Sequence, residues 1–136
     1  MQTAHFPIRV YWEDTDAGGI VYHANYLRFM ERARSDLLRQ IGFGQDAQRG
    51  REDGILFVVA SIELTYHRAA KLDDDLTVNT RVTKLGRASL IFEQIITRGE
   101  ERITSANVRV GVVNAVTMAP ARMPADVYEK IQTFAA

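Results

Sequence analysis

Cysteine is absent from this 136-residue chain, and histidine occurs only three times. The absence of cysteine excludes disulfide bonds, thiolate metal sites and a cysteine nucleophile. His5, His23 and His67 are too scattered to suggest a zinc site. The sequence therefore predicts neither a bound metal ion nor another cofactor.

An excess of one charge and long apolar runs are also lacking. Lys and Arg together number 17, as do Asp and Glu, and the resulting zero net charge without a basic run argues against nucleic-acid binding. No run approaches the roughly 18 apolar residues of a membrane helix, and the first residues do not resemble a secretory signal. We expect a cytoplasmic protein with no membrane span.

The overall composition is that of an ordinary globular domain. Hydrophobic residues make up 46% and charged residues 25% of the chain, which excludes collagen, coiled coil and disorder. A chain of 136 residues can bury a sizeable core as one unit. We expect a single domain over residues 1–136, without repeats or linkers.

One long helix is predicted by apolar residues that recur every three or four positions. These residues are Tyr26, Leu27, Met30, Ala33, Leu37, Leu38 and Ile41. The pattern begins near Ala24 and ends before Gly42, a residue type that commonly follows a helix. A helix of that extent is about 27 Å long.

An acidic loop, residues 13–19, runs directly into the start of this helix. It carries Asp14, Asp16 and the pair Gly18-Gly19, which allows a tight turn. The free N–H groups at a helix start could polarise a carbonyl group or hold an anion beside such a carboxylate. Aspartates in front of a helix are equally consistent with turn capping. An EF-hand calcium loop is excluded, because it needs an oxygen ligand where Gly18 stands and a glutamate where Asn25 stands.

Alternating apolar residues and glycine-bearing links predict five strands and a second, short helix. The strands are expected at residues 8–12, 55–67, 76–82, 88–97 and 102–113, and the helix runs from Pro124 to Phe134. In the second strand the even positions from Leu56 to Tyr66 are all apolar, and its length favours a bulge. Residues 43–54 are expected to be irregular, with one helical turn within 45–51.

These elements predict an α+β fold with one sheet layer and one long helix. A single helix of about 10 Å diameter cannot cover both faces of a five-stranded sheet. The uncovered face and the sheet edges therefore predict a homodimer or a higher closed oligomer.

The loop and helix start resemble a known family. The matching run extends from Val10 to Tyr26 and continues from Phe29 to Arg34, and further matches lie in residues 70–74 and 87–90. This pattern resembles hotdog-fold acyl-CoA thioesterases of the 4-hydroxybenzoyl-CoA thioesterase family, most of all those associated with the Tol-Pal system. The resemblance implies a five-stranded antiparallel sheet wrapped around a long central helix, assembled as dimers and often dimers of dimers. It also implies a bacterial envelope context, with acyl carrier protein or phospholipid enzymes as candidate partners.

The resemblance assigns the chemistry to the acidic loop. It implies that Asp16 is the catalytic carboxylate and that the backbone N–H around His23 stabilises the oxyanion. Ala17 stands where the 4-hydroxybenzoyl-CoA enzymes carry proline, and His23-Ala24 replaces their Tyr-Pro. These departures favour an aliphatic acyl-CoA as substrate. An ionised Asp16 could attack the thioester carbon directly or activate a water molecule, and the sequence leaves both routes open.

Four further residues are predicted to contact the substrate. Tyr22 and Asn25 lie beside the reacting group, although tyrosine is a common packing residue and asparagine a common helix-start residue. Arg87 and Ser89 match the region that contacts coenzyme A in the family. The segment with His67, Arg68 and Lys71 offers additional contacts or is simply a solvated loop.

Two other functions fit the same fold class. A dehydratase on this scaffold would pair a histidine with a carboxylate across a subunit interface, for which His23 and Glu63 are the candidates. A module that binds acyl-CoA or an acyl carrier protein without turnover is the other alternative. Thiol release distinguishes a hydrolase from both.

Overall fold

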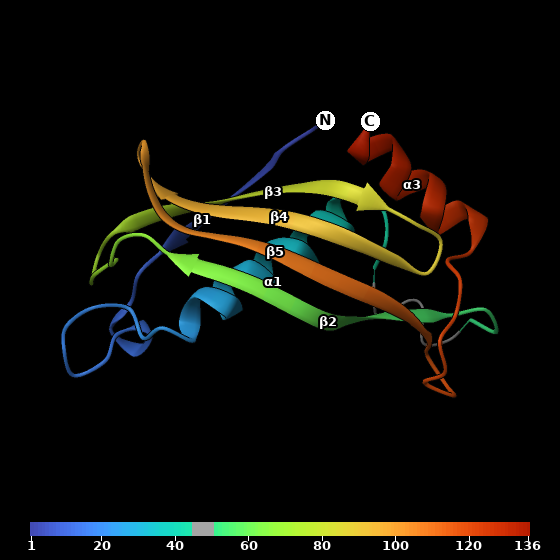
Figure 1. The fold of residues 1–136 in the computed structure, drawn as a ribbon, viewed down its shortest axis with the longest axis horizontal. Helices are drawn as coiled ribbons and strands as arrows, with labels where there is room; N and C mark the ends of the chain where they lie inside the picture. Colours follow the sequence, from blue (N-terminus) through green and yellow to red (C-terminus); the bar gives the residue numbers. More distant parts are fainter. Residues whose placement is uncertain (45–50) are drawn as a thin grey trace.

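Five strands and two helices make up the computed structural model, which describes residues 1–44 and 51–136 (Figure 1). The elements in chain order are β1 (Ala4–Arg9), α1 (Asn25–Gln40), β2 (Ile55–Tyr66), β3 (Asp75–Leu85), β4 (Ser89–Arg98), β5 (Glu101–Asn114) and α3 (Ala125–Ala135). The helical turn predicted within residues 45–51 falls mostly outside the described residues.

The strands form one antiparallel sheet in the order β1-β3-β4-β5-β2, and α1 lies along one of its faces (Figure 1). Strands β3, β4 and β5 are consecutive neighbours, so the predicted meander is confirmed. The predicted α+β class is confirmed as well. Helix α1 ends before a glycine, as expected. Gly42 has a φ of 91°, which residues other than glycine rarely adopt.

The core lies between α1 and the sheet face that it covers. Phe29 and Met30 of α1 are fully buried there, as are alternate residues of the sheet such as Phe92 and Val108. Burial of a side chain of this size contributes roughly 2 kcal/mol. Gln94 is a fully buried polar residue of β4, and it links sheet and helix because its Nε2 donates to the carbonyl oxygen of Met30 at 2.9 Å.

The first strand differs from its prediction. β1 ends at Arg9, and residues Trp12–Asp14 form a 3₁₀ turn in place of the predicted strand end. The turn forms because the Asp14 carboxylate accepts a hydrogen bond from the Tyr11 backbone N–H at 2.8 Å. Trp12, predicted as the last residue of the strand, lies in this turn and is 82% exposed.

Strand β2 contains the predicted bulge, and the bulge changes which residues face α1. Val59 is paired with Val110 and Ser61 with Arg109, so Ala60 is one extra residue. The odd positions before Ala60 face α1, whereas the even positions face it afterwards. The prediction that even positions form one face is therefore correct only after the bulge.

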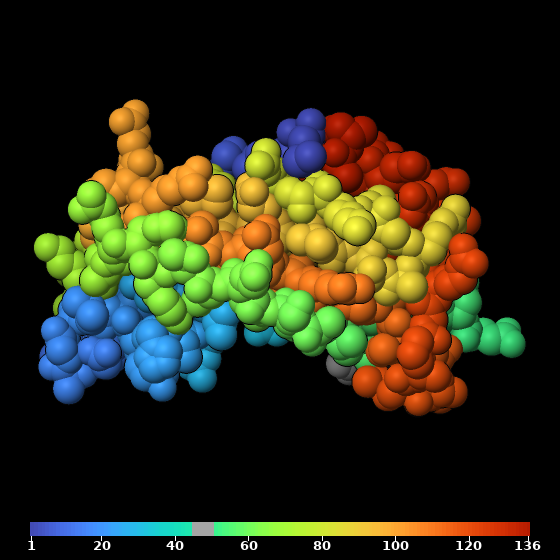
Figure 2. All heavy atoms as spheres, in the orientation of Figure 1, coloured from blue at the N-terminus to red at the C-terminus, as the bar shows by residue number. Residues whose placement is uncertain are grey.

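In the part of the chain that the structure describes, one long edge of the sheet has no strand beside it. β2 pairs with β5 on one side and is the last strand of the sheet on the other. Figure 2 shows this edge recessed between two projecting segments, the blue loop before α1 and the orange loop after β5. Neither described helix is both long and apolar enough to cross a membrane.

Candidate active site

The loop that leads into α1 is anchored by the buried carboxylate of Asp14. Asp14 is 6% exposed, and its two oxygens accept hydrogen bonds from the Tyr11 N–H at 2.8 Å and from Nδ2 of Asn25 at 3.1 Å. The Tyr22 N–H donates to the Asp14 carbonyl oxygen at 2.9 Å. These bonds bring residues 11–14 and the start of α1 together. Asp14 therefore fixes the loop, because each of its two carboxylate oxygens accepts a hydrogen bond from a neighbouring segment.

Asp16 lies two residues further on and is exposed. Its Oδ1 accepts one hydrogen bond, from the Gly18 N–H at 2.8 Å. The backbone around it closes as a small hairpin, because the Asp16 N–H donates to Ile20 and the Gly19 N–H donates back to Asp16. Gly19 has a φ of 79°, which explains why glycine is needed in the hairpin. The carboxylate of Asp16 is therefore held on a defined loop with acceptor capacity to spare.

The start of α1 has free backbone donors. Its N-cap is Ala24, which cannot cap the helix with a side chain, and the first turn contains no acidic residue. Within the described ranges, no acceptor lies within hydrogen-bond reach of the N–H groups of His23 and Ala24. Such free N–H groups carry the positive end of the helix dipole and suit a developing negative charge.

A cavity of about 340 Å³ opens beside His23. It is lined by Ile20, Val21, His23, Tyr26, Tyr66, His67, Arg68 and Ala69. Its apolar residues suit an acyl chain, and its volume is at the low end of the range for small-molecule sites. Asp16 does not line it, so the carboxylate stands outside the cavity, on the hairpin that ends at Ile20.

Two tyrosine hydroxyls hold the cavity wall. The Tyr66 hydroxyl donates to the carbonyl oxygen of His23 at 2.8 Å, and the Tyr26 hydroxyl accepts from the Ala70 N–H at 3.1 Å. Their rings meet edge to face with centroids 5.6 Å apart. Burial raises the pKa of Tyr26, so its hydroxyl stays protonated and neutral.

An ion pair supports the segment behind this wall. Asp74 is paired with Arg98 at 2.6 Å and also accepts from the Lys71 N–H at 2.9 Å. Burial alone would raise the pKa of Asp74, but the hydrogen bonds from Lys71 and Arg98 outweigh it, so the pKa lies below its usual value. The Asp74 carbonyl oxygen also accepts from the Val10 N–H, which ties the segment to the chain in front of the acidic loop.

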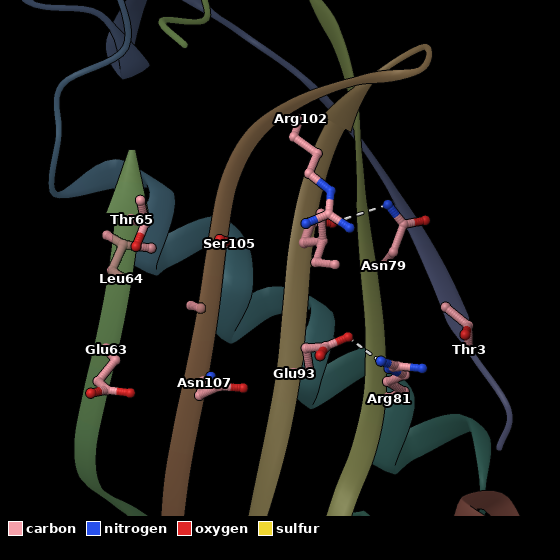
Figure 3. A pocket seen from close by; sticks show the side chains of 12 residues that line it. Thr3, Glu63, Leu64, Thr65, Asn79, Arg81, Glu93, Arg102, Ser105 and Asn107 are labelled. Atoms are coloured by element: carbon pink, nitrogen blue, oxygen red, sulfur yellow. Dashed lines mark hydrogen bonds and ion pairs between the residues drawn. The ribbon is translucent and has the colours of Figure 1, made fainter. Parts of the chain in front are cut away.

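A larger hollow of about 860 Å³ lies on the other face of the sheet, away from α1 (Figure 3). Glu93 and Arg81 form an ion pair across two strands there, and Glu63 lies in the same row of the sheet (Figure 3). Of the six residues predicted for the site, none lines this hollow. Its polar side chains are those of a solvated sheet face. Glu63 points away from the face that α1 covers, so one chain does not bring it to His23.

The predicted residues fall into two groups at opposite ends of the sheet. Tyr22, His23 and Asn25 lie at the α1 start together with the Asp16 loop, and the Tyr22 and His23 rings are 4.6 Å apart. Asn25 is buried against Asp14, which makes it part of the scaffold.

Arg87 and Ser89 form the second group, at the turn between β3 and β4. The 11 residues of β3 separate them from the Asp16 end, a distance of about 36 Å at about 3.3 Å per residue. The Arg87 guanidinium stacks over the Tyr128 ring of α3 at 4.1 Å. One chain therefore does not bring these two residues to the α1 start.

Tyr66 is the site residue that the sequence did not reveal. Its position in an alternating strand indicated a buried face, whereas the residue is 47% exposed and lines the cavity. The only local signal is its place at the end of β2, where a strand runs into a polar loop. In the described part of the chain, no group of three or more His, Asp or Glu side chains could hold a metal ion.

Comparisons with known proteins identify the family of this chain. Residues 10–131 match the thioesterase-like superfamily. The chain is 45% identical over 122 residues to the acyl-CoA thioesterase YbgC of Haemophilus influenzae, covering 90% of this chain and 89% of that protein. It is 42% identical to the acyl-CoA thioester hydrolase YbgC of Escherichia coli O6:H1, covering 88% of each. The crystal structure of a probable thioesterase from Bartonella henselae superposes with a TM-score of 0.85 at 39% identity, covering 90% of this chain and 99% of that one.

Proposed function

This chain belongs to the thioesterase-like superfamily, and we propose that it hydrolyses acyl-CoA thioesters to a free acid and coenzyme A. The reaction takes place where the Asp16 loop meets the start of α1. One observation carries the proposal: free backbone N–H groups at His23 and Ala24 lie beside an apolar cavity, with an exposed carboxylate on the loop directly before them.

Each part of thioester hydrolysis has a matching group. The acyl chain lies in the cavity of about 340 Å³, and its carbonyl oxygen faces the His23 N–H. That N–H and the helix dipole stabilise the negative charge of the tetrahedral intermediate. One such donor lowers the activation barrier by about 3 kcal/mol. The C–S bond then breaks, and coenzyme A leaves as a thiolate.

Asp16 starts the reaction by one of two routes. As a general base it takes a proton from water while the oxygen of that water bonds to the acyl carbon. As a nucleophile it forms an anhydride with the acyl group, which water then hydrolyses. Its single hydrogen bond, from Gly18, leaves one oxygen free for either route. The thiolate is a good leaving group, so no further acid is needed.

A homodimer completes the binding site. The free β2 edge carries no lysine or proline, the residues that usually protect an edge, and it exposes Val58 and Val59. Antiparallel pairing of two β2 strands about a two-fold axis continues the sheet. It also puts the β3–β4 turn of one subunit at the same end as the Asp16 loop of the other. The partner's Arg87 and the partner's Ser89 then contact the coenzyme A phosphates, and pairing of the outer sheet faces gives a dimer of dimers.

An acyl carrier protein is a second candidate donor of the acyl group. Arg28, Arg32 and Arg39 lie on one exposed side of α1, and none of them pairs with a carboxylate among residues 1–44 and 51–136. A basic helix surface attracts an acidic protein. Both donors belong to the cytoplasm, where we place the enzyme.

The test follows free thiol released from short, medium, long and aromatic acyl-CoAs by three proteins. We expect the wild type to favour an aliphatic substrate and Asp16→Asn to release thiol roughly a thousandfold more slowly, because the amide is neither base nor nucleophile. Asp75→Asn is the matched control, since Asp75 is exposed at the same end of the sheet and pairs only loosely with Arg9, at 3.6 Å. Light scattering and circular dichroism establish that all three share one fold and one oligomeric state.

Each alternative outcome has a distinct meaning. Binding of acyl-CoA without thiol release by the wild type would indicate a binding module. Equal release by the wild type and Asp16→Asn would remove Asp16 from the mechanism. Hydration of an enoyl-CoA that survives Asp16→Asn would favour a dehydratase.

A further inference from the structure

The Tyr66 hydroxyl makes the one side-chain hydrogen bond to the backbone of His23 in the described part of the chain. It donates to the His23 carbonyl oxygen at 2.8 Å from a position 43 residues later in the sequence. Its ring is half exposed at the cavity and packs edge to face on Tyr26, with centroids 5.6 Å apart. The Tyr66 ring is thus fixed by packing on Tyr26, and its hydroxyl is bonded to the backbone of the site.

Both peptide planes that flank His23 are fixed from their carbonyl side. The Tyr22 carbonyl accepts from the Asn25 N–H at 2.8 Å, and the His23 carbonyl accepts from Tyr66. A peptide group is planar, so fixing the carbonyl direction also fixes the direction of the N–H on the same plane. The N–H groups of His23 and Ala24 are therefore held in defined directions, although neither has an acceptor among the described residues.

The two bonds differ in origin. The Asn25 bond closes a local turn, residues 22–25, that leads directly into α1. The Tyr66 bond comes from β2 and exists only in the folded sheet. A hydrogen bond to a carbonyl oxygen also polarises the peptide and strengthens its N–H as a donor.

We propose that Tyr66 is a positioning residue for thioester hydrolysis: through the His23 carbonyl it orients the Ala24 N–H, which stabilises the oxyanion together with the His23 N–H. This inference rests on the proposed hydrolase function. It differs from the plain alternative, in which Tyr66 is only an aromatic wall of the acyl cavity. A wall contributes its ring, whereas a positioning residue contributes its hydroxyl.

Tyr66→Phe separates the two roles because it keeps the ring and removes only the hydroxyl. With the best acyl-CoA of the panel, we expect kcat to fall about tenfold, since misdirected oxyanion donors weaken transition-state binding. KM and the affinity for coenzyme A, measured by calorimetry, should stay within about twofold, because ground-state contacts are kept. Tyr11→Phe is the matched control, because Tyr11 is 59% exposed and does not line the cavity.

A second measurement examines the hydrogen bond without any turnover. In ¹⁵N spectra of the wild type and Tyr66→Phe, the Ala24 amide should shift, because the carbonyl group bonded to its nitrogen loses a donor. Amides of α3, far from the site, should not move.

The outcomes separate this inference from the function on which it rests. A normal kcat in Tyr66→Phe, a raised KM with unchanged kcat, or an unmoved Ala24 amide would each overturn the positioning role and leave the hydrolase intact. A wild type that releases no thiol would overturn both. A lower kcat with equal thermal midpoints and a shifted Ala24 amide is the result that supports the inference.

Discussion

The loop before α1 has two halves that contain the same chemical group in opposite surroundings. In the first half, residues 11–14, the Asp14 carboxylate is buried and bonded to Tyr11 and Asn25. In the second half, residues 16–19, the Asp16 carboxylate is exposed and bonded to Gly18 alone. The comparison teaches that position along a motif does not decide a role. Partners and exposure make one aspartate a scaffold and leave the other free to react.

The largest effect should come from replacing each aspartate by alanine and comparing the free energies of unfolding in urea. Asp14→Ala leaves the Tyr11 N–H and the buried Asn25 amide without an acceptor and should cost about 2–4 kcal/mol. Asp16→Ala removes one exposed hydrogen bond and should change stability by no more than about 0.5 kcal/mol. Equal losses in the two variants would contradict the division between the halves.

The next effect concerns the two glycines of the second half. Gly19→Ala puts a side chain at a φ of 79° and should destabilise the protein by about 1 kcal/mol. Gly18→Ala brings a Cβ to within 3.2 Å of Oδ1 of Asp16, so it should displace the carboxylate. We expect Gly18→Ala to lower the rate of thiol release with little change in stability. Gly19→Ala should lower stability with little change in that rate. Thermal midpoints and initial rates measured on the same samples test this reversal.

The smallest effect is a pH dependence of stability that comes from Asp74, whose segment supports the chain in front of residues 11–14. The pKa of Asp74 is lower in the folded protein than its usual value of 3.8, because hydrogen bonds from Lys71 and Arg98 outweigh burial. Its stabilising contribution is therefore complete above about pH 4 and is lost as pH falls through the folded pKa. Asp74→Asn should lower stability at pH 7 by about 1 kcal/mol and flatten the loss below pH 4. Urea midpoints between pH 7 and pH 2.5 measure both effects; parallel curves would exclude this role.

Periodicity predicted most of the fold because burial against one partner leaves a regular pattern. Helix α1, strands β3, β4 and β5 and the final helix all lie within a few residues of their predicted positions. The end of the first strand was predicted wrongly. Alternation of Val10 and Trp12 favoured a strand. The chain turns there instead, because the Asp14 carboxylate accepts a hydrogen bond from the Tyr11 backbone N–H. A hydrogen bond of that kind leaves no periodic signal.

The sequence predicted the chemical groups of the site better than their positions in space. A carboxylate before a helix start was visible in the sequence, but the difference between Asp14 and Asp16 depends on burial, which the pattern does not encode. The contact of Tyr66 with His23 could not be predicted either, because Tyr66 lies at the end of β2, 43 residues further along the chain. Arg87 and Ser89 appeared to belong with Asp16, whereas β3 separates them along its full length.

The extra residue in β2 also determines how this chain tolerates the loss of a codon. Removing Ala60 would leave Val59 opposite Val110 and Ser61 opposite Arg109, so every other side chain of the strand would keep its face. Removing a residue further along the strand would shift every residue between the deletion and Ala60 by one position and turn those side chains to the opposite face. Ala60 is therefore the position in β2 where a one-residue deletion costs the least, and the strand can shorten there without changing what it presents to α1.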